Sequence, residues 1–331
     1  MDEVSPSFLS IFLNPFSMTI IKRLDLKLGF SCNNNCLSCP QAHNKHLGDM
    51  SIKQIRENLA LGIKHGANEV VLTGGEPTVR RDISDIVSYA NEIGYSHIQL
   101  QTNGRMLSYK SFVNKLISAG VTEFSPAIHG HTPEIHDYIT GSRGAFNQVV
   151  MGIRNLKELD QRVIANSVIS KLNYKHLSEL AQLFIDLKVD QFQLAFIHPV
   201  GNAWKNFDLL VPRKSHVMES VHEAIDLAVA KNTNVMVEAY PFCFMKGYER
   251  YCSELYMPPS EIINEKTVTT NFDKIRKTQG KVKPPQCKKC RFDLICEGPW
   301  KEYTAKYGYE EFKPIPGKKV KDSNQIFDHE S

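Results

Sequence analysis

The chain has 331 residues, of which 42% are hydrophobic and 23% charged, and its formal net charge is +4 at pH 7. These values are ordinary for a globular protein, and the length fits one large domain or one large and one small domain. The slight charge, with no long basic run before residues 317–321, does not indicate a nucleic-acid partner.

The amino-terminal residues 1–21 contain an apolar stretch, residues 8–21, which is interrupted by Asn14 and Pro15. This stretch is shorter than the roughly 20 apolar residues that cross a bilayer, and it lacks the basic region of a signal peptide. We therefore expect no membrane span. Residues 1–21 are predicted to form an extension that packs on the following domain, and a membrane-surface role is the alternative.

Residues 22–30 place three leucines on one face by simple alternation, which predicts a β-strand. The loop that follows holds three cysteines with a Cys-x3-Cys-x2-Cys spacing, Cys32, Cys36 and Cys39. Soft thiolates select zinc or iron–sulfur clusters. A structural zinc site normally has four protein ligands. Three ligands are what a [4Fe–4S] cluster needs if one iron must stay free to bind a substrate.

The second predicted strand, residues 69–72, runs directly into the sequence TGGEP at residues 73–77. Two adjacent glycines let the backbone approach a ligand closely. A carboxylate such as that of Glu76 forms a charge-assisted hydrogen bond with an ammonium group. The turn therefore has the composition of a site for an amine-bearing ligand.

Strands and helices alternate from residue 22 to residue 231 and predict an α/β fold. Further strands are predicted at residues 98–100, 123–129, 163–169 and 191–197, with a short one at 235–239. Helices are predicted at residues 52–63, 83–94, 112–120, 149–159, 177–187 and 214–230. This alternation indicates a parallel sheet with crossover helices, and six units are too few for a closed eight-fold barrel. Ligand sites in such sheets lie at the carboxyl ends of the strands.

The cysteine loop and the TGGEP turn, in this order and each at a strand end, resemble the signature of the radical S-adenosylmethionine (SAM) enzymes. The resemblance implies an open, partial (β/α)6 barrel over residues 22–234. It implies that the three cysteines hold a [4Fe–4S] cluster whose open iron chelates SAM. SAM would be split into methionine and a 5′-deoxyadenosyl radical, which abstracts a hydrogen atom from the substrate. The residues implied to bind SAM in the turn are Gly74, Gly75, Glu76 and Pro77.

One position departs from the family pattern. The residue before the third cysteine is usually aromatic in the family and lies against the adenine, whereas this chain has Ser38. Another residue must therefore pack against the adenine.

Other polar residues at predicted strand ends are candidates for contacts with SAM or substrate. They are Thr102, Asn103, Ser125, His129, Asn166, Ser167 and His198. Each has a plain alternative as a satisfied polar group of the core or rim. The group His129, His131 and His136 also invites a zinc interpretation. We favour instead a role for His129 at the cavity and surface positions for the other two.

The chain has eight cysteines, and five of them follow residue 242. Because no secretion signal is present, clustered cysteines indicate metal ligands and a reducing, cytoplasmic location. From Cys243 onward the strand–helix alternation stops and prolines cluster. This change places a domain boundary near residue 235, so residues 235–331 are expected to form a small carboxyl-terminal domain and tail.

Three of these later cysteines have a Cys-x2-Cys-x5-Cys spacing, Cys287, Cys290 and Cys296. This spacing resembles the auxiliary-cluster region of the SPASM and twitch subfamilies of radical SAM enzymes, although Trp300 stands where a full SPASM domain has a further cysteine. The resemblance implies one auxiliary [4Fe–4S] cluster, with Cys243 as the fourth ligand and Cys252 as the alternative. If only the three downstream cysteines bind, an open iron would be left for substrate. A structural zinc knuckle is the other interpretation.

The sequence therefore predicts a radical SAM enzyme with two [4Fe–4S] clusters and SAM as cofactors, similar to the molybdenum-cofactor GTP cyclase and peptide-maturase branches. The expected substrate is a small metabolite or cofactor precursor. A peptide or protein side chain is the alternative, although no separate leader-binding domain is visible before residue 22. The expected electron donor is a protein such as ferredoxin or flavodoxin. A hypothesis of another class is a non-catalytic iron–sulfur or zinc-binding protein.

Overall fold

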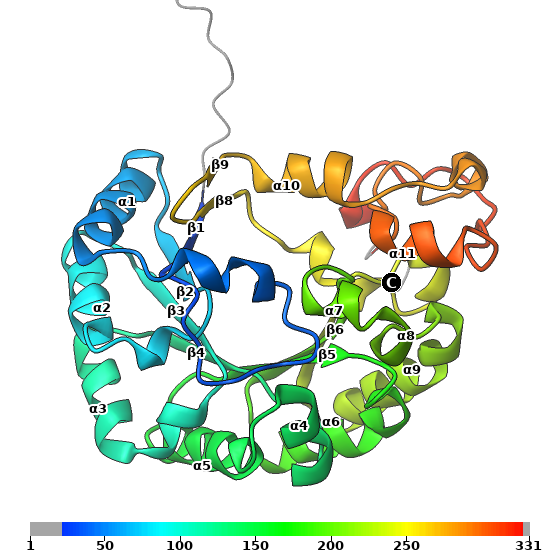
Figure 1. Cartoon of the computed structure of the whole chain (residues 1–331). Helices are drawn as coiled ribbons and strands as arrows, with labels where there is room; N and C mark the ends of the chain where they lie inside the picture. The colour runs from blue at the N-terminus through cyan, green and yellow to red at the C-terminus, as the bar shows by residue number, and fades with distance from the viewer. Residues whose placement is uncertain (1–21, 327–331) are drawn as a thin grey trace, which may run out of the picture.

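The structure is a computed structural model that describes residues 22–326, so the extension predicted at residues 1–21 lies outside the described residues. Its main element is a curved, largely parallel sheet with helices on the outer face (Figure 1). One part of the sheet has the order β4-β3-β2-β1-β8-β9 and the other the order β5-β6-β7. Parallel bridges between Phe124 and Val163 and between Ala127 and Asn166 join β4 to β5. The predicted partial barrel is thereby confirmed.

The strands of the two parts are β1 (Arg23–Lys27), β2 (Glu69–Thr73), β3 (His97–Thr102), β4 (Glu123–Pro126), β5 (Ile164–Ile169), β6 (Gln191–Phe196), β7 (Asn234–Glu238), β8 (Ser260–Ile263) and β9 (Val268–Thr269). The outer helices are α1 (Ile52–Lys64), α2 (Ile83–Glu92), α3 (Lys110–Ala119), α4 (Pro133–Thr140), α5 (Ala145–Glu158), α6 (Leu177–Asp186) and α9 (Lys214–Ala230). Four shorter helices are α7 (Asn202–Lys205), α8 (Phe207–Leu210), α10 (Phe272–Ile275) and α11 (Lys301–Tyr307).

The alternation in β1 shows how the sequence sets the two faces of the sheet. Leu24 and Leu26 are fully buried in the core shared with the helices. Arg23 and Asp25, on the opposite face, line the interior of the barrel. Because successive side chains of a strand point to opposite faces, this one pattern separates the apolar outer layer from a polar interior.

Helix α1 begins with the capping box that its sequence predicts. The Ser51 side chain accepts a hydrogen bond from the Gln54 backbone, and the Gln54 side chain accepts one from the Ser51 backbone. These bonds satisfy two backbone groups at the helix start and fix where the chain leaves the cysteine loop.

Several elements are absent from the sequence-based expectations, among them α4 and β8. Helix α4 is only eight residues long, which is too short for its period to stand out, although Pro133 in its first turn and Gly141 after its end are ordinary boundary signals. Strand β8 comes from the carboxyl-terminal region and pairs in parallel with β1, so this region extends the barrel sheet beyond its first strand. In the part of the chain that the structure describes, no helix combines the length and apolar character needed to cross a membrane.

Candidate active site

The interior of the barrel is a cavity of about 1160 Å³, which we call the main cavity. Its wall is formed by inward-facing residues of the strands, by the loops at their carboxyl ends and by segments of the carboxyl-terminal region. This volume exceeds the roughly 300–1,000 Å³ of ordinary ligand pockets. The main cavity therefore has room for more than one bound molecule.

The cysteine loop lies against this cavity, and its three cysteines, Cys32, Cys36 and Cys39, all line it. Side chains from distant elements hold the loop in place. The Asn202 side chain donates a hydrogen bond to the Cys36 carbonyl oxygen (3.0 Å), and the Asn202 backbone donates one to the Cys39 carbonyl oxygen (3.0 Å). Arg105 donates to the Asn34 side chain (3.0 Å). The loop is thus fixed from α7 on one side and from the end of β3 on the other.

The electrostatics of the loop favour a bound metal centre. Burial raises the pKa of Cys36 to about 12, and the neighbouring Cys32 and Cys39 raise it further. The Asn34 backbone donates to the Cys32 sulfur (3.4 Å), a contact of the kind made to cluster thiolates. Thiols bind metals as thiolates, so such a site becomes ionised only when the metal supplies compensating charge.

The TGGEP turn lies beside the loop and is locked to it through the backbone. Gly75 donates a hydrogen bond to the Gly29 carbonyl oxygen (2.8 Å), and Glu76 donates one to that of Ser31 (2.8 Å). A Cβ atom at Gly75 would lie 2.3 Å from the Ser31 carbonyl oxygen, so only glycine allows this approach. Gly74, Gly75 and Glu76 all line the main cavity.

The Glu76 carboxylate is fully buried and receives four hydrogen bonds. The donors are the Thr78 backbone (2.9 Å), the Thr78 hydroxyl (2.5 Å), the Thr102 hydroxyl (2.7 Å) and the Asn103 backbone (2.5 Å). Three of these donors converge on Oε1, and only the Asn103 backbone bonds Oε2, so Oε2 can still accept a further hydrogen bond. Burial raises the pKa of Glu76, and the hydrogen bonds oppose that rise. Glu76 thereby ties the TGGEP turn to the end of β3.

Most of the other predicted polar residues also line the main cavity, namely Ser38, Thr102, Asn103, Ser125, His129 and Asn166. Ser167 is fully buried and, with alternation, lies on the other face of β5. His198 stacks on Trp300, with ring centroids 3.8 Å apart, and Trp300 in turn lines the cavity. Pro77 is buried at the start of the short helix after the turn.

His129 is held as a neutral ring. Its Nδ1 accepts a hydrogen bond from the Val168 backbone (3.2 Å), which leaves its proton on Nε2. Burial and the adjacent His136 lower the pKa of His129 to about 3. This histidine can therefore offer a hydrogen-bond donor to the cavity without adding a charge.

The cations that line the main cavity are engaged with carboxylates. Arg23 bonds Glu69 (3.0 Å), Arg162 bonds Glu123 (2.6 Å), and Arg276 makes a two-pronged contact with Glu297 (2.7 and 3.0 Å). Asp25 and Glu238 add two further carboxylates to the wall. The described wall thus carries more carboxylates than cations.

Among the cavity residues that the sequence did not nominate are Glu238, Ser253 and Trp300. The Ser253 hydroxyl oxygen and the Trp300 Nε1 are buried without a hydrogen-bond partner among the described residues, as is the Asn166 Oδ1. Burial, followed by the neighbouring Glu254, raises the pKa of Glu238 to about 6. Glu238 ends a predicted strand, so the rule of carboxyl-terminal strand ends could have nominated it. Ser253 and Trp300 carried no such signal.

The later cysteines gather in the carboxyl-terminal region. Cys243, Cys287, Cys290 and Cys296 line one small enclosed space together with Lys283. The Phe242 and Gly298 backbones donate to the Cys296 sulfur. Cys252 is buried outside this lining, and its sulfur lies 4.0 Å from the Tyr240 carbonyl oxygen. The structure thus groups Cys243, and not Cys252, with the other three.

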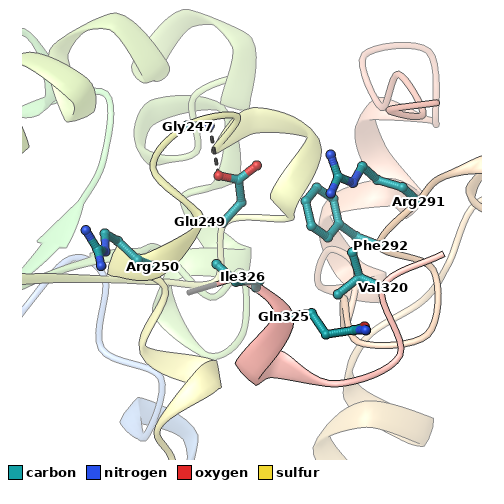
Figure 2. Close-up of a pocket in the computed structure, with 8 residues that line it drawn as sticks. All are labelled: Gly247, Glu249, Arg250, Arg291, Phe292, Val320, Gln325 and Ile326. Atoms are coloured by element: carbon teal, nitrogen blue, oxygen red, sulfur yellow. Dashed lines mark hydrogen bonds between the residues drawn. The ribbon is translucent and has the colours of Figure 1, made fainter. Parts of the chain in front are cut away.

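A further cavity, of about 340 Å³, lies between residues 247–250 and the last described segment of the chain (Figure 2). Arg291 and Phe292 form one wall, and the Glu249 carboxylate turns back to accept a hydrogen bond from the Gly247 backbone (2.8 Å). None of the described cysteines and no residue of the TGGEP turn lines it. This cavity therefore contains none of the residues that the sequence nominates as cofactor or metal ligands.

Comparison with known proteins agrees with this geometry. Residues 26–184 match the radical SAM superfamily. A probable GTP 3′,8-cyclase from Sulfolobus acidocaldarius is 32% identical over 184 residues, which are 55% of this chain and 58% of that protein. An AdoMet-dependent heme synthase from Methanosarcina barkeri is 30% identical over 177 residues, which are 53% of this chain and 50% of that protein. The chain therefore spans little more than half of these relatives.

Solved structures show the same fold over a longer part of the chain. SuiB from Streptococcus suis, bound to S-adenosylmethionine, superposes with a TM-score of 0.65 at 17% identity. The superposition covers 91% of this chain and 77% of SuiB. With the cysteine loop and the TGGEP turn brought together at one end of a partial barrel, the match over residues 26–184 places this part of the chain in the radical SAM superfamily.

Proposed function

We propose that the chain is a radical SAM enzyme that abstracts a hydrogen atom from a small metabolite or cofactor precursor. The observation that carries this proposal is that the three early cysteines and the TGGEP turn line one cavity with room for more than one molecule. When bound, the cluster supplies the electron that splits SAM into methionine and a 5′-deoxyadenosyl radical.

Different residues of the chain would bind the cluster, position the TGGEP turn and bind SAM. Cys32, Cys36 and Cys39 hold the cluster. Because donors from Thr78, Thr102 and Asn103 hold the Glu76 carboxylate, Glu76 positions the turn. The SAM amino group would bind to the backbone of Gly74 and Gly75 and to the Oε2 atom of Glu76, which has one donor only, and polar side chains such as Asn166 would orient the bound molecules.

The second group of cysteines is proposed to hold an auxiliary [4Fe–4S] cluster. Its ligands are Cys243, Cys287, Cys290 and Cys296, which share one enclosed space. One structural zinc ion held by the same four thiolates is the alternative. The cluster would relay an electron or anchor the substrate, and the external reductant would be a small carrier such as ferredoxin or flavodoxin.

The charge of the main cavity bears on the substrate. GTP, the substrate named for the Sulfolobus relative, carries a triphosphate that requires several unpaired cations. In the described wall of the cavity, Arg23, Arg162 and Arg276 are each paired with a carboxylate, and His129 is neutral. We therefore propose a substrate without a phosphate chain.

The unpartnered polar atoms indicate how such a substrate would be held. Trp300 Nε1 can donate a hydrogen bond, Asn166 Oδ1 can accept one, and the Ser253 hydroxyl can do either. The Glu238 carboxyl would bind an amine or a hydroxyl group. Together they suit a polar metabolite that has both donors and acceptors.

A peptide or protein side chain is the second candidate substrate. SuiB, whose fold covers most of this chain, has also been seen bound to its precursor peptide SuiA. A single polar side chain entering the main cavity would meet the same recognition groups as a metabolite.

The deciding experiment is anaerobic reconstitution with iron and sulfide, followed by addition of dithionite and SAM and measurement of 5′-deoxyadenosine. We expect the wild-type chain to release it. Cys36→Ala should abolish the release, whereas Cys290→Ala should retain part of it. A folded wild-type chain that binds iron but never cleaves SAM would establish the non-catalytic alternative. Equal and complete loss in both variants would contradict separate roles for the two cysteine groups.

A further inference from the structure

A group of metal-ligating side chains lies apart from both cysteine groups. His131 is in the loop after β4, His176 ends the short helix after β5 (Tyr174–His176), and Glu179 is in the first turn of α6. One donor atom from each lies within 4.8 Å of the others. We propose that these three residues bind a divalent transition-metal ion of the zinc class.

The donor set has the chemistry of such a site. Two imidazole nitrogens and one carboxylate oxygen are the protein ligands of zinc sites that keep a fourth position open for water or another ligand. The imidazole rings of His131 and His176 lie with their centroids 4.9 Å apart, and His176 Nδ1 is 3.3 Å from the Glu179 carboxylate. The three side chains are already gathered without an ion.

An ion would also satisfy a group that the protein leaves unpaired. His131 Nδ1 is buried and has no hydrogen-bond partner among the described residues. Buried polar atoms are nearly always paired, so an unpaired one calls for an explanation. A surface ion pair between His176 and Glu179 alone would leave this nitrogen unsatisfied, whereas a metal that His131 binds through Nδ1 would account for it.

The proposed metal site is connected by hydrogen bonds to residues that line the main cavity. Asn173 donates hydrogen bonds to the carbonyl oxygens of His129 and Val168 (both 2.9 Å), and its own carbonyl accepts one from the His176 backbone (2.9 Å). His129 and Val168 line the main cavity. A metal that joins His131 to His176 would therefore clamp together the loops after β4 and β5, which form part of the cavity rim.

The test measures zinc binding to the full chain after anaerobic cluster reconstitution, so that the cysteines are occupied. Equilibrium dialysis against zinc chloride, with zinc and iron measured by atomic emission, gives the zinc stoichiometry and the Kd. We expect one zinc ion per chain in addition to the clusters. His131→Gln, His176→Gln and Glu179→Gln should each weaken this binding at least tenfold.

The matched control is His216→Gln, because His216 is an exposed histidine on α9 that is not one of the three grouped residues. Its zinc affinity should equal that of the wild type. Glu179 is exposed, so Glu179→Gln decides the matter even if a histidine variant fails to fold. A wild-type chain that binds no zinc beyond its cysteines, or an unchanged Kd in folded Glu179→Gln, overturns the proposal. The readout does not depend on SAM cleavage, so it stands or falls separately from the proposed enzymatic function.

Discussion

At the scale of single residues, Glu76 has a role that its motif alone does not reveal. The sequence suggests a carboxylate for the SAM ammonium group, and the structure adds that the same side chain accepts hydrogen bonds from Thr78, Thr102 and Asn103 and so ties the turn to β3. The motif identifies Glu76 as a site residue. The hydrogen bonds of Glu76, however, depend on the end of β3, which lies about 25 residues further along the chain.

This arrangement leads to a prediction for Glu76→Gln. The amide has one oxygen in place of two, so its NH₂ group must face at least one buried donor. We expect the free energy of unfolding in urea to fall by about 2–3 kcal/mol. Glu57→Gln, at an exposed position on α1, should change it by less than about 0.5 kcal/mol. Equal stability of both variants would show that the Glu76 carboxylate does not hold the turn.

Glu238 gives a prediction for pH dependence. Its pKa is raised to about 6 from the ordinary 4.5 by burial and by the Glu254 charge. The folded chain thus holds this proton more tightly than the unfolded chain does. The stabilisation is complete below pH 4.5 and is lost as the pH rises through 6, a change of about 2 kcal/mol.

Glu238→Gln removes this contribution while keeping an oxygen to accept the Gln193 hydrogen bond. The loss of unfolding free energy between pH 5 and pH 7.5, measured in urea, should therefore be smaller by roughly 1 kcal/mol in the variant than in the wild type. Glu57→Gln serves again as the control. Identical pH dependence in wild type and Glu238→Gln would mean that Glu238 titrates normally.

At the scale of elements, the cysteine loop and the TGGEP turn are held together by a backbone contact that tolerates no side chain. Gly75→Ala would place a Cβ atom 2.3 Å from the Ser31 carbonyl oxygen and push the loop away from the turn. We expect the reconstituted variant to lose iron from the first cluster and to cleave SAM at least tenfold more slowly. Gly280→Ala is the control, since its Cβ would meet Trp300 at an ordinary 3.5 Å. Full iron content and full SAM cleavage in Gly75→Ala would show that the close approach of Gly75 to the Ser31 carbonyl oxygen is not needed to hold the cysteine loop.

The sequence predicts some elements better than others, for physical reasons. Helix α9 (Lys214–Ala230) has the predicted bounds, and the six strands of the barrel lie within a few residues of their predicted positions. Each has an apolar face with a clear period. Helix α4 is only eight residues long, which is too short for its period to stand out, and β8 is four residues long and follows prolines. Its partner, β1, is more than 200 residues away, so its pairing depends on long-range packing.

At the scale of the whole molecule, the main cavity is completed by residues from opposite ends of the chain. The residues proposed to bind the cluster and SAM lie at the carboxyl ends of strands in the first half of the chain, and the alternation of apolar residues locates those strands. Ser253 and Trp300, which are proposed to contact the substrate, come from the carboxyl-terminal region, which has no repeating pattern. Trp300 reaches the cavity because it stacks on His198 and lies beside Lys281. The sequence therefore predicts where the cofactors bind better than it predicts how substrate is recognised.

The final prediction concerns the number and ligands of the clusters in the whole chain. Two [4Fe–4S] clusters require about eight irons per chain, and a zinc knuckle in the tail would leave about four. Because Cys243 shares the enclosed space with Cys287, Cys290 and Cys296, Cys243→Ser should lower the iron content to about four. Cys252 is buried outside that space, so Cys252→Ser should retain about eight.

The measurement is iron, sulfide and zinc per chain after oxygen-free reconstitution, together with the electron paramagnetic resonance spectrum of the reduced protein. In Cys243→Ser the spectrum should keep the component that changes when SAM is added, since the early cysteines are intact. Loss of iron in Cys252→Ser but not in Cys243→Ser would show that Cys252, and not Cys243, is the fourth ligand of the auxiliary cluster. About four irons and one zinc in the wild type would replace the auxiliary cluster with a structural zinc site, while leaving the SAM-binding half of the molecule as described.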